Sequence, residues 1–569
     1  LIEQRDARQN VQRNTWDLAG RRIRHAVIPA TGAPQITTWR YQAGRLVEIV
    51  HPGQREQIAY DVRGQAVSRT VRLQLASGAH VTHLTRYIHN DDGSLKAQSL
   101  PDGTYLEYER NGQGQVVALH RRTSPWTLFG WGRQTLASGL ERDLVGLAHI
   151  TYGNGIEGRW QRSRQGVLAR VVYTQPQHHA VDPARLAAAT RAAVRQPVAG
   201  RLLDLLIPAA RAQTAPDAAG KLPGALGMPA EPAALFDARL IYDPAGNVLL
   251  QAQRGQGAHA SLAYAYDSRA QLVAAQSIPR AAIVKTASRA PEASVWRYYY
   301  DRNGNRVLAQ EEVPVSEMGQ TRRATYDAVS NALIDPPPQR EYRWNAQGQL
   351  IAVRERGNDL ARYRYDARGL RIASESFTPA SASAATRNAP QRGHAAYTLY
   401  NDARQRIADL DADGRITRQY VWLGDKLVAT LDPAKPQAPQ APADGVLAEL
   451  ARTAQALWNR LAGNGERTAF VHLNHLGAPI AATDTSGQTL WQADYAPYGK
   501  RVGTRAERTR PYDLALRLPG QWADEETGLY YNDFRYYDPQ AGRYLSPDPL
   551  GRLAEALGSP NAYAYVNNN

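Results

Sequence analysis

One short pattern recurs along the chain: an aromatic residue, then Asp or Asn, two further residues, Gly, one more residue and an aliphatic side chain. The Asp or Asn side chain accepts hydrogen bonds from backbone amides two residues on. The Gly supplies the left-handed conformation that a bulged hairpin loop needs. Each copy therefore predicts a β-hairpin with the aromatic residue on its first strand. The clear copies are Tyr60–Gly64, Tyr242–Val248, Tyr300–Asn305, Trp344–Leu350 and Tyr365–Leu370.

Looser copies extend the pattern. Tyr266 has Ala270 where Gly is expected, and Tyr326 has Ser330 there. Where neighbouring copies lie close they are roughly 20–25 residues apart, a spacing typical of repeats that stack on one another. The sequence therefore predicts stacked hairpins rather than several globular domains. The degenerate copies near the start pair Tyr41 with Gly44, Tyr87 with Gly93 and Tyr108 with Gly112.

The amino-acid composition limits the kinds of cross-link and active site that the chain can contain. The 569 residues include 30 Tyr and 11 Trp but only 5 Phe, which suits half-buried strands whose rings pack inward while a polar tip finds a partner. There is no Cys, so disulfides, thiol catalysis and Cys-ligated zinc are excluded. No segment approaches the ~20 apolar residues of a membrane span.

The end of the chain carries a dense set of aromatic pairs and turn residues. It runs through Leu518–Trp522, Gly528–Asn532 and Phe534–Pro539 to Gly542–Gly551 and Asn561–Asn569. This stretch resembles the RHS-repeat-associated core domain of bacterial RHS proteins, and the hairpin motif resembles their YD repeat. The family includes polymorphic toxins, type VI secretion effectors and the C component of ABC toxin complexes. The resemblance implies an all-β fold, a spiral of YD-repeat hairpins that forms a hollow shell (cocoon) with small helical insertions.

The repeat is interrupted twice, and the breaks predict the organisation of the chain. Residues 1–174 and 237–432 are expected to form the shell, and residues 466–569 the core that closes it. Residues 175–236 form an Ala/Pro-rich insertion with a helix-forming stretch, either a loop on the shell or a plug inside it. Residues 433–465 combine a Pro-rich linker with an amphipathic helix expected over 446–461.

The resemblance also implies a function. Relatives enclose a C-terminal toxin or effector domain, so that cargo is the expected partner, with a secretion-spike or N-terminal delivery module and an immunity protein as further partners. The protein is expected to be made in the bacterial cytoplasm and then secreted or injected into target cells. In the family a variable domain begins where this chain stops, at Asn569. The start, at Leu1, has no initiator Met and no signal-peptide pattern, so the true N-terminus is expected to be missing or cleaved off.

One residue is a candidate for catalysis, Asp548 in Asp548-Pro549-Leu550-Gly551. Many RHS proteins cut themselves after the core, and the resemblance implies an aspartyl-protease-like reaction in which two carboxylates share one proton. The partner carboxylate would lie in a second Asp-Pro-x-Gly-Leu beyond Asn569. The alternative role of Asp548 is that of a turn residue before Pro. No conventional enzyme activity and no cofactor are expected.

Other patterns point to no site. His472 and His475 are three residues apart, but a metal site needs a third ligand and none is evident. We therefore expect these histidines to stabilise a hairpin through hydrogen bonds to the backbone. The net charge of +15 comes from scattered Arg residues, which favours a basic surface over a specific nucleic-acid site. Two other functions stay open: a secreted adhesion or glycan-binding module with an outer aromatic patch, and a nonspecific nucleic-acid scaffold.

Overall fold

The computed structural model describes residues 3–5, 9–30, 32–122, 133–175, 234–255, 261–278, 294–312, 320–326, 340–377, 393–439, 465–506, 511–549 and 561–566. These residues form β-strands and no α-helix. The helices expected within residues 175–236 and over 446–461 lie outside the described residues. Residues 208–232, the Pro- and Ala-rich part of the first insertion, also lie outside them.

The first sheet has 22 strands, and each strand pairs antiparallel with the next one along the chain. Most of these strands come in hairpins, as the repeat predicts. They are β1 (Glu3–Arg5), β2 (Val11–Trp16), β3 (Arg22–Ile28), β4 (Gln35–Gln42), β5 (Arg45–His51), β6 (Gln54–Tyr60), β7 (Ala66–Gln74), β8 (His80–His89), β9 (Leu95–Ser99), β10 (Tyr105–Arg110), β11 (Val116–Arg122), β12 (Arg133–Arg142), β13 (Leu147–Tyr152), β14 (Glu157–Arg162), β15 (Leu168–Thr174), β16 (Ala234–Tyr242), β17 (Val248–Arg254), β18 (Ser261–Tyr266), β19 (Leu272–Ile278), β20 (Val295–Tyr300), β21 (Arg306–Glu312) and β22 (Gln320–Arg323).

The second sheet has 12 strands in the same antiparallel meander. They are β23 (Arg340–Trp344), β24 (Leu350–Glu355), β25 (Asn358–Tyr365), β26 (Arg371–Phe377), β27 (Gly393–Tyr400), β28 (Arg406–Leu410), β29 (Ile416–Leu423), β30 (Lys426–Asp432), β31 (Arg467–Leu473), β32 (Pro479–Thr483), β33 (Thr489–Tyr495) and β34 (Arg501–Ala506). A small third sheet, here called the core sheet, contains β35 (Gln521–Ala523), β36 (Tyr530–Asn532), β37 (Arg535–Asp538) and β38 (Arg543–Tyr544).

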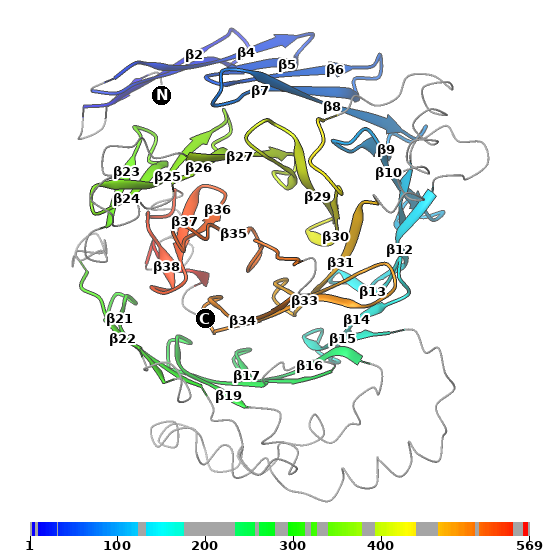
Figure 1. Cartoon of the computed structure of the whole chain (residues 1–569), viewed down its shortest axis with the longest axis vertical. Coiled ribbons are helices and arrows are strands. Elements are labelled where there is room, and N and C mark those ends of the chain that lie inside the picture. Colours follow the sequence, from blue (N-terminus) through cyan, green and yellow to red (C-terminus); the bar gives the residue numbers. More distant parts are fainter. Residues whose placement is uncertain are drawn as a thin grey trace, which may run out of the picture.

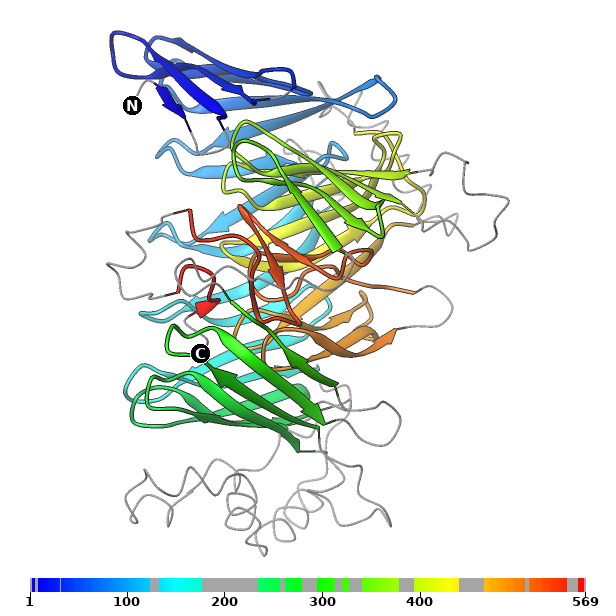
Figure 2. The same ribbon diagram turned by 90° about the vertical axis from the view of Figure 1, so that its left-hand side faces the viewer.

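The two large sheets form two turns of a spiral. In Figure 1 the first sheet runs around the outside from β2 to β22, and the second sheet follows the same direction on its inner side from β23 to β34. The core sheet and the C-terminal end of the chain lie inside the ring in this view. Figure 2 shows the same layers from the side, with the core sheet at mid-height. The predicted spiral of hairpins is therefore confirmed.

The turn chemistry follows the predicted pattern. In the β20–β21 hairpin the Gly304 amide donates to the Asp301 carbonyl at 3.1 Å, and the side chain of Asp301 accepts from the amides of Asn303 and Asn305 at 2.9 Å each. Gly304 has a φ of 75° and Gly369 a φ of 84°, the left-handed region that L side chains rarely adopt. Asp fixes the loop and Gly lets it close.

Two sequence interpretations need correction. The glycine of the Asn111 turn is Gly114, whose amide donates to the Asn111 carbonyl at 2.9 Å, and not Gly112. The turn that ends at Gly93 begins at Asn90, so Tyr87 does not occupy the aromatic position before the turn. The looser copy at Tyr266 forms the same turn as the clear copies, since the Ala270 amide donates to the Asp267 carbonyl at 3.0 Å and Ala270 adopts a φ of 60°.

The recurrent tyrosine has a role that the pattern alone did not indicate. Its hydroxyl donates to the carbonyl of the residue two positions after the left-handed turn residue of an earlier hairpin, which links one repeat to another. Tyr is needed here because Phe has no hydroxyl to donate. The pairs are Tyr60–Leu46, Tyr242–Leu168, Tyr300–Leu272, Tyr326–Arg306, Tyr365–Leu350, Tyr400–Arg371 and Tyr495–Pro479, at 2.5 to 3.0 Å.

The hydrophobic core lies between the layers. One cluster joins β9–β16 to β29–β32, and another joins β7 to β26–β28. Tyr173 shows how tightly the layers meet: its buried hydroxyl donates to the Leu473 carbonyl at 2.9 Å and accepts from the Leu473 amide at 3.1 Å. The two turns of the spiral therefore form one double-layered wall.

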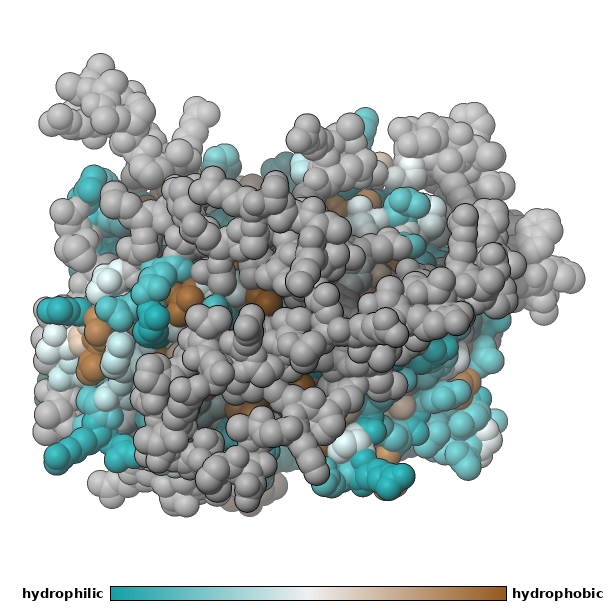
Figure 3. Space-filling view, turned by 90° about the horizontal axis from the view of Figure 1, so that it is seen from below, coloured by the Kyte–Doolittle hydropathy of each residue, from teal (hydrophilic) through white to brown (hydrophobic). Residues whose placement is uncertain are grey.

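The outward side of the first sheet carries ion pairs on β4–β6. On β4–β6 the carboxylate of Glu48 pairs with Arg40 at 3.2 Å and with Arg55 at 2.5 Å. In Figure 3 the described residues on the visible face are mostly hydrophilic, with apolar residues interspersed. The charges of Arg40 and Arg55 are thus partly neutralised by the carboxylate that lies between them.

Candidate functional site around Asp548

The core sheet brings Asp548 to its place through a tight turn. Asp538 ends β37, and its side chain accepts from the amides of Gln540 and Ala541 at 2.8 and 3.1 Å. Gly542 closes this turn with a φ of 67°. The chain then passes through β38, and the Leu545 amide donates to the Tyr536 carbonyl at 2.8 Å. These contacts fix the direction in which the chain leaves the sheet toward Asp548.

The last described segment holds Asp548 from the other side. The Asp548 amide donates to the Ala562 carbonyl at 2.8 Å, and the Tyr544 amide donates to the Tyr563 carbonyl at 2.9 Å. Residues 561–564 therefore lie as a turn against β38 and the residues that follow it, with an isolated antiparallel bridge between Arg543 and Ala564.

Arg535 is the charged partner of Asp548. Its Nη2 lies 3.0 Å from Asp548 Oδ2, and its Nη1 donates to the Ala562 carbonyl at 3.3 Å. The guanidinium stacks on the Tyr544 ring at 3.6 Å from the ring centre. Arg535 thus joins the stretch before residue 549 to the stretch after residue 560.

The sequence singled out Asp548, and the structure places it in a half-buried position, with 23% of its side chain exposed. Its catalytic role stays a prediction. Sequence reasoning did not identify Arg535, because an Arg within Phe534–Pro539 looks like any other strand residue. The structure shows that Asp533, two residues before Arg535, adopts a left-handed conformation where β36 turns back into β37.

Buried charge anchors the core sheet to the second turn of the wall. Arg371 on β26 donates to Asp524 Oδ2 at 2.5 Å, and Tyr363 donates to the same oxygen at 3.0 Å. Burial acts to lower the pKa of Arg371, but the Asp524 carboxylate outweighs it and the pKa rises well above its usual value. The position of the core sheet, and with it of Asp548, is therefore set by the wall.

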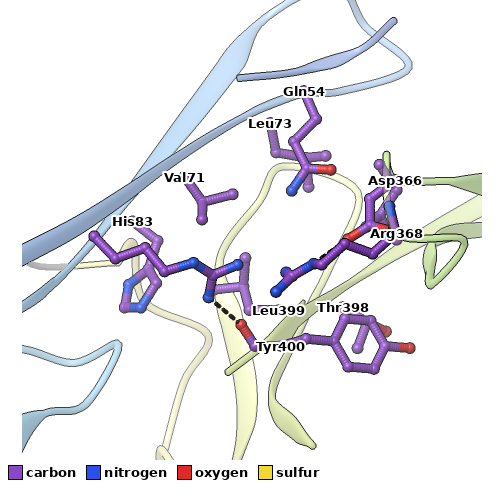
Figure 4. A pocket seen from close by; sticks show the side chains of 11 residues that line it. Gln54, Val71, Leu73, His83, Asp366, Arg368, Thr398, Leu399 and Tyr400 are labelled. Atoms are coloured by element: carbon purple, nitrogen blue, oxygen red, sulfur yellow. Dashed lines mark hydrogen bonds and ion pairs between the residues drawn. The ribbon is translucent and has the colours of Figure 1, made fainter. Parts of the chain in front are cut away.

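A pocket lies at another contact between the two turns, among β6–β8 and β26–β27. Figure 4 shows the side chains that line it. Arg69 Nη1 donates to the Tyr400 carbonyl at 2.7 Å. Arg69 also pairs with Glu56 at 2.7 Å, and Arg368 with Asp366 at 3.3 Å. These charged side chains therefore pair with one another. Since they come from both turns of the spiral, we interpret the pocket as part of the contact between the two layers.

The histidines flagged in the sequence are packing residues. His472 Nε2 lies 2.8 Å from the Thr483 hydroxyl, a side-chain partner where a backbone one was expected. Its ring packs edge-on against Tyr152 and Tyr173 of the first sheet at 4.7 and 4.9 Å. Burial lowers the pKa of His472 to about 3 and that of His475 to about 4. Among the described residues no group of His, Asp and Glu is arranged to hold a metal ion.

The described part of the chain gives no support to the glycan-binding alternative. Its strongly exposed aromatic side chains are Trp16, Tyr299 and Phe534, which come from β2, β20 and the β36–β37 turn and so form no row on one surface. No described helix is both long and apolar enough to span a membrane.

Comparison with known families agrees with the hairpin pattern. The model of the Teneurin YD-shell family matches residues 225–415, and that of the RHS protein family matches residues 469–503. The first match includes β16–β28 and the second includes the β32–β33 region and most of β31, whereas β29 and β30 lie between the two matches.

Several similar proteins are named as toxins or toxin subunits. "Double-stranded DNA deaminase toxin A" of Burkholderia cenocepacia is 30% identical over 327 residues, which cover 48% of this chain and 22% of that protein. "Toxin subunit YenC1" of Yersinia entomophaga is 27% identical over 380 residues, which cover 58% of this chain and 36% of that protein. The chain thus spans well under half the length of these relatives.

A solved structure has the same fold over the whole chain. The crystal structure of TcdB2-TccC3 superposes with a TM-score of 0.70 at 19% identity, over 100% of this chain and 27% of that one. At this identity the likeness establishes the fold, which is that of a YD shell.

Proposed function

Because this chain is an RHS-repeat protein with a YD-shell fold, we propose that it forms part of the wall of a cage that encloses a toxin or effector domain following it in the full-length protein. The observation that carries the proposal is the double-layered wall with the core sheet and the C-terminal end on its inner side. A chain that continues from residue 566 starts inside the ring of Figure 1. An enclosed domain cannot reach its target in the producing cell.

The toxin names of the relatives support a toxic cargo. The cargo would be held by many weak contacts and by confinement, not by one tight site. Its further partners would be a secretion-spike or N-terminal delivery module and an immunity protein that neutralises the cargo. The protein would be made in the bacterial cytoplasm and then secreted or injected into target cells.

The second part of the proposal is self-cleavage that frees the cargo from the wall. Asp548 would be one of two carboxylates, and the other would lie beyond Asn569. One carboxylate takes a proton from water as the water oxygen attacks the peptide carbonyl carbon, and the other gives a proton to the departing amide nitrogen. Arg535 and the Ala562 carbonyl hold Asp548 in place for this step.

The test uses the full-length protein and its Asp548→Asn variant, which keeps the side-chain shape but removes the titratable group. The wild type is expected to give two bands on a denaturing gel but to elute as a single species in native chromatography. The variant is expected to give one band on the gel and also to elute as a single species. A variant that still gives two bands would show that Asp548 is a turn residue only. Separation of the two fragments in native buffer would contradict enclosure.

A further inference from the structure

The segment that holds Asp548 is itself held by the first sheet. Asn305 closes the turn of the β20–β21 hairpin, and its Oδ1 accepts from Asn561 Nδ2 at 2.8 Å and from Arg543 Nη1 at 3.2 Å. Asn561 also donates to the Asn303 carbonyl at 3.3 Å. All of these side-chain contacts join residues more than 230 positions apart, since the separations are 256, 238 and 258.

These contacts are buried and specific. Asn305, Arg543 and Asn561 are 2%, 6% and 4% exposed. The guanidinium of Arg543 lies between two rings, 4.4 Å from the centre of Tyr326 on the wall and 4.6 Å from the centre of Tyr563 on the last segment. Losing the Asn305 oxygen would take an acceptor from two buried donors, one of them charged, which is costly in a buried site.

The chain of contacts runs from the wall to the candidate catalytic residue. Asn305 fixes Asn561 and Arg543; Asn561 directly precedes Ala562, whose carbonyl accepts from Asp548 and from Arg535. If the β20–β21 hairpin were absent or undocked, the turn formed by residues 561–564 would lose its outer support. Asp548 would then lose a fixed backbone position.

We propose that Asn305 is a positioning residue for self-cleavage at Asp548, so that cleavage proceeds only when the β20–β21 hairpin has docked on the core sheet. The inference rests on the proposed self-cleavage. It gives the cage a checkpoint: the cargo is cut free only after the first turn of the wall has reached the core. Cutting earlier would release the cargo from an open wall.

The chain offers matched variants. Asn305→Ala removes the oxygen that faces the core and also the bond from Asn305 Nδ2 to Asp301 Oδ2, 2.9 Å long. Asn305→Asp keeps an acceptor for Asn561 and Arg543. Its other carboxylate oxygen replaces the donor to Asp301 Oδ2 and repels that carboxylate, so the turn itself is destabilised in this variant as well. Asn247→Ala is the control for the turn itself, because Asn247 Nδ2 makes the same bond to Asp243 Oδ2, at 2.8 Å, in the β16–β17 hairpin.

The experiment measures the rate of self-cleavage of the full-length protein after synthesis in vitro, on a denaturing gel. Asn305→Ala is expected to slow cleavage about 100-fold, the loss that a displacement of about 1 Å at a reacting group produces. Asn305→Asp should cleave within about threefold of wild type, since the acceptor across the contact remains. Asn247→Ala should cleave at the wild-type rate and lose less thermal stability than Asn305→Ala, because it does not take the acceptor from Asn561 and Arg543.

Hydrogen exchange gives a readout that does not depend on cleavage. The amides of Tyr544 and Asp548, which donate to residues 563 and 562, should lose protection in Asn305→Ala and keep it in Asn247→Ala. If Asn305→Ala does not fold, Asn561→Ala takes its place in both assays. Asn561→Ala removes the Asn561–Asn305 hydrogen bond from the core side.

The outcomes separate the two proposals. If the wild type and Asp548→Asn behave alike, self-cleavage at Asp548 is wrong and this inference fails with it. If Asp548→Asn abolishes cleavage but Asn305→Ala and Asn561→Ala cleave at the wild-type rate, only the checkpoint is overturned. Equal slowing by Asn247→Ala would also overturn it, because turn stability alone would then explain the effect.

Discussion

The tyrosine link between hairpins can be tested by removing one oxygen atom. Tyr400 is 7% exposed, and its hydroxyl donates to the Arg371 carbonyl at 3.0 Å. Tyr400→Phe keeps the ring and removes only this donor. A buried carbonyl that loses its partner costs about 1–3 kcal/mol, because water cannot reach it. We expect the variant to lose that much free energy of unfolding.

Tyr60→Phe is the matched control. Tyr60 makes the same link, to the Leu46 carbonyl at 2.9 Å, but it is only partly buried, so water can replace the lost donor. The expected loss is about 0.5 kcal/mol or less. A difference of about 1 kcal/mol between the variants corresponds to roughly a fivefold change in the ratio of folded to unfolded protein.

The assay is urea unfolding followed by tryptophan fluorescence, with hydrogen exchange of β26–β27 as a local check, because a long repeat protein need not unfold in one step. The Tyr400→Phe midpoint should fall clearly below that of Tyr60→Phe, with faster exchange in β26–β27. Equal midpoints, or a larger effect at Tyr60, would refute the role assigned to the buried hydroxyl.

Further predictions concern turns and pH. Ala270→Gly should stabilise the protein by up to about 1 kcal/mol, since glycine adopts the observed φ of 60° without strain, whereas Gly304→Val should destabilise it by about 1 kcal/mol or more; thermal melting checks both. Burial lowers the pKa of His472 to about 3, so the unfolded chain takes up a proton below about pH 6.5 while the folded one does not. Stability tied to His472 is therefore full above pH 6.5 and falls as the pH drops toward 3, by about 2 kcal/mol at pH 5. His472→Gln, which keeps a hydrogen-bonding group for the Thr483 hydroxyl, should lose less stability between pH 7 and 5 than wild type, and equal acid sensitivity would contradict the assignment.

Short-range chemistry explains how much of the fold could be predicted. Asp301 and Gly304 form their turn with each other and with neighbours a few residues away, so a five-residue pattern is enough to predict the hairpin. Ala270 shows the limit of the pattern, because the rest of the hairpin holds a non-glycine residue in the same conformation.

Contacts between layers could not be predicted from the pattern. Tyr173 meets Leu473 across 300 positions, and Asn305 meets Asn561 across 256. Nothing near Asn305 marks it off from Asn247, which has the same turn bonds. Asp548 was found because its motif is recognisable, whereas Arg535 becomes visible only when the core sheet brings it within 3.0 Å.

The most direct test of the account is an electron cryomicroscopy structure of the full-length protein. We expect the two-turn wall to continue into a closed shell, with density for the domain that follows residue 569 inside it and the chain entering from the end of the segment 561–566. A folded C-terminal domain outside the wall, or a wall whose inner side is filled by its own side chains, would contradict the proposal that this chain encloses a cargo.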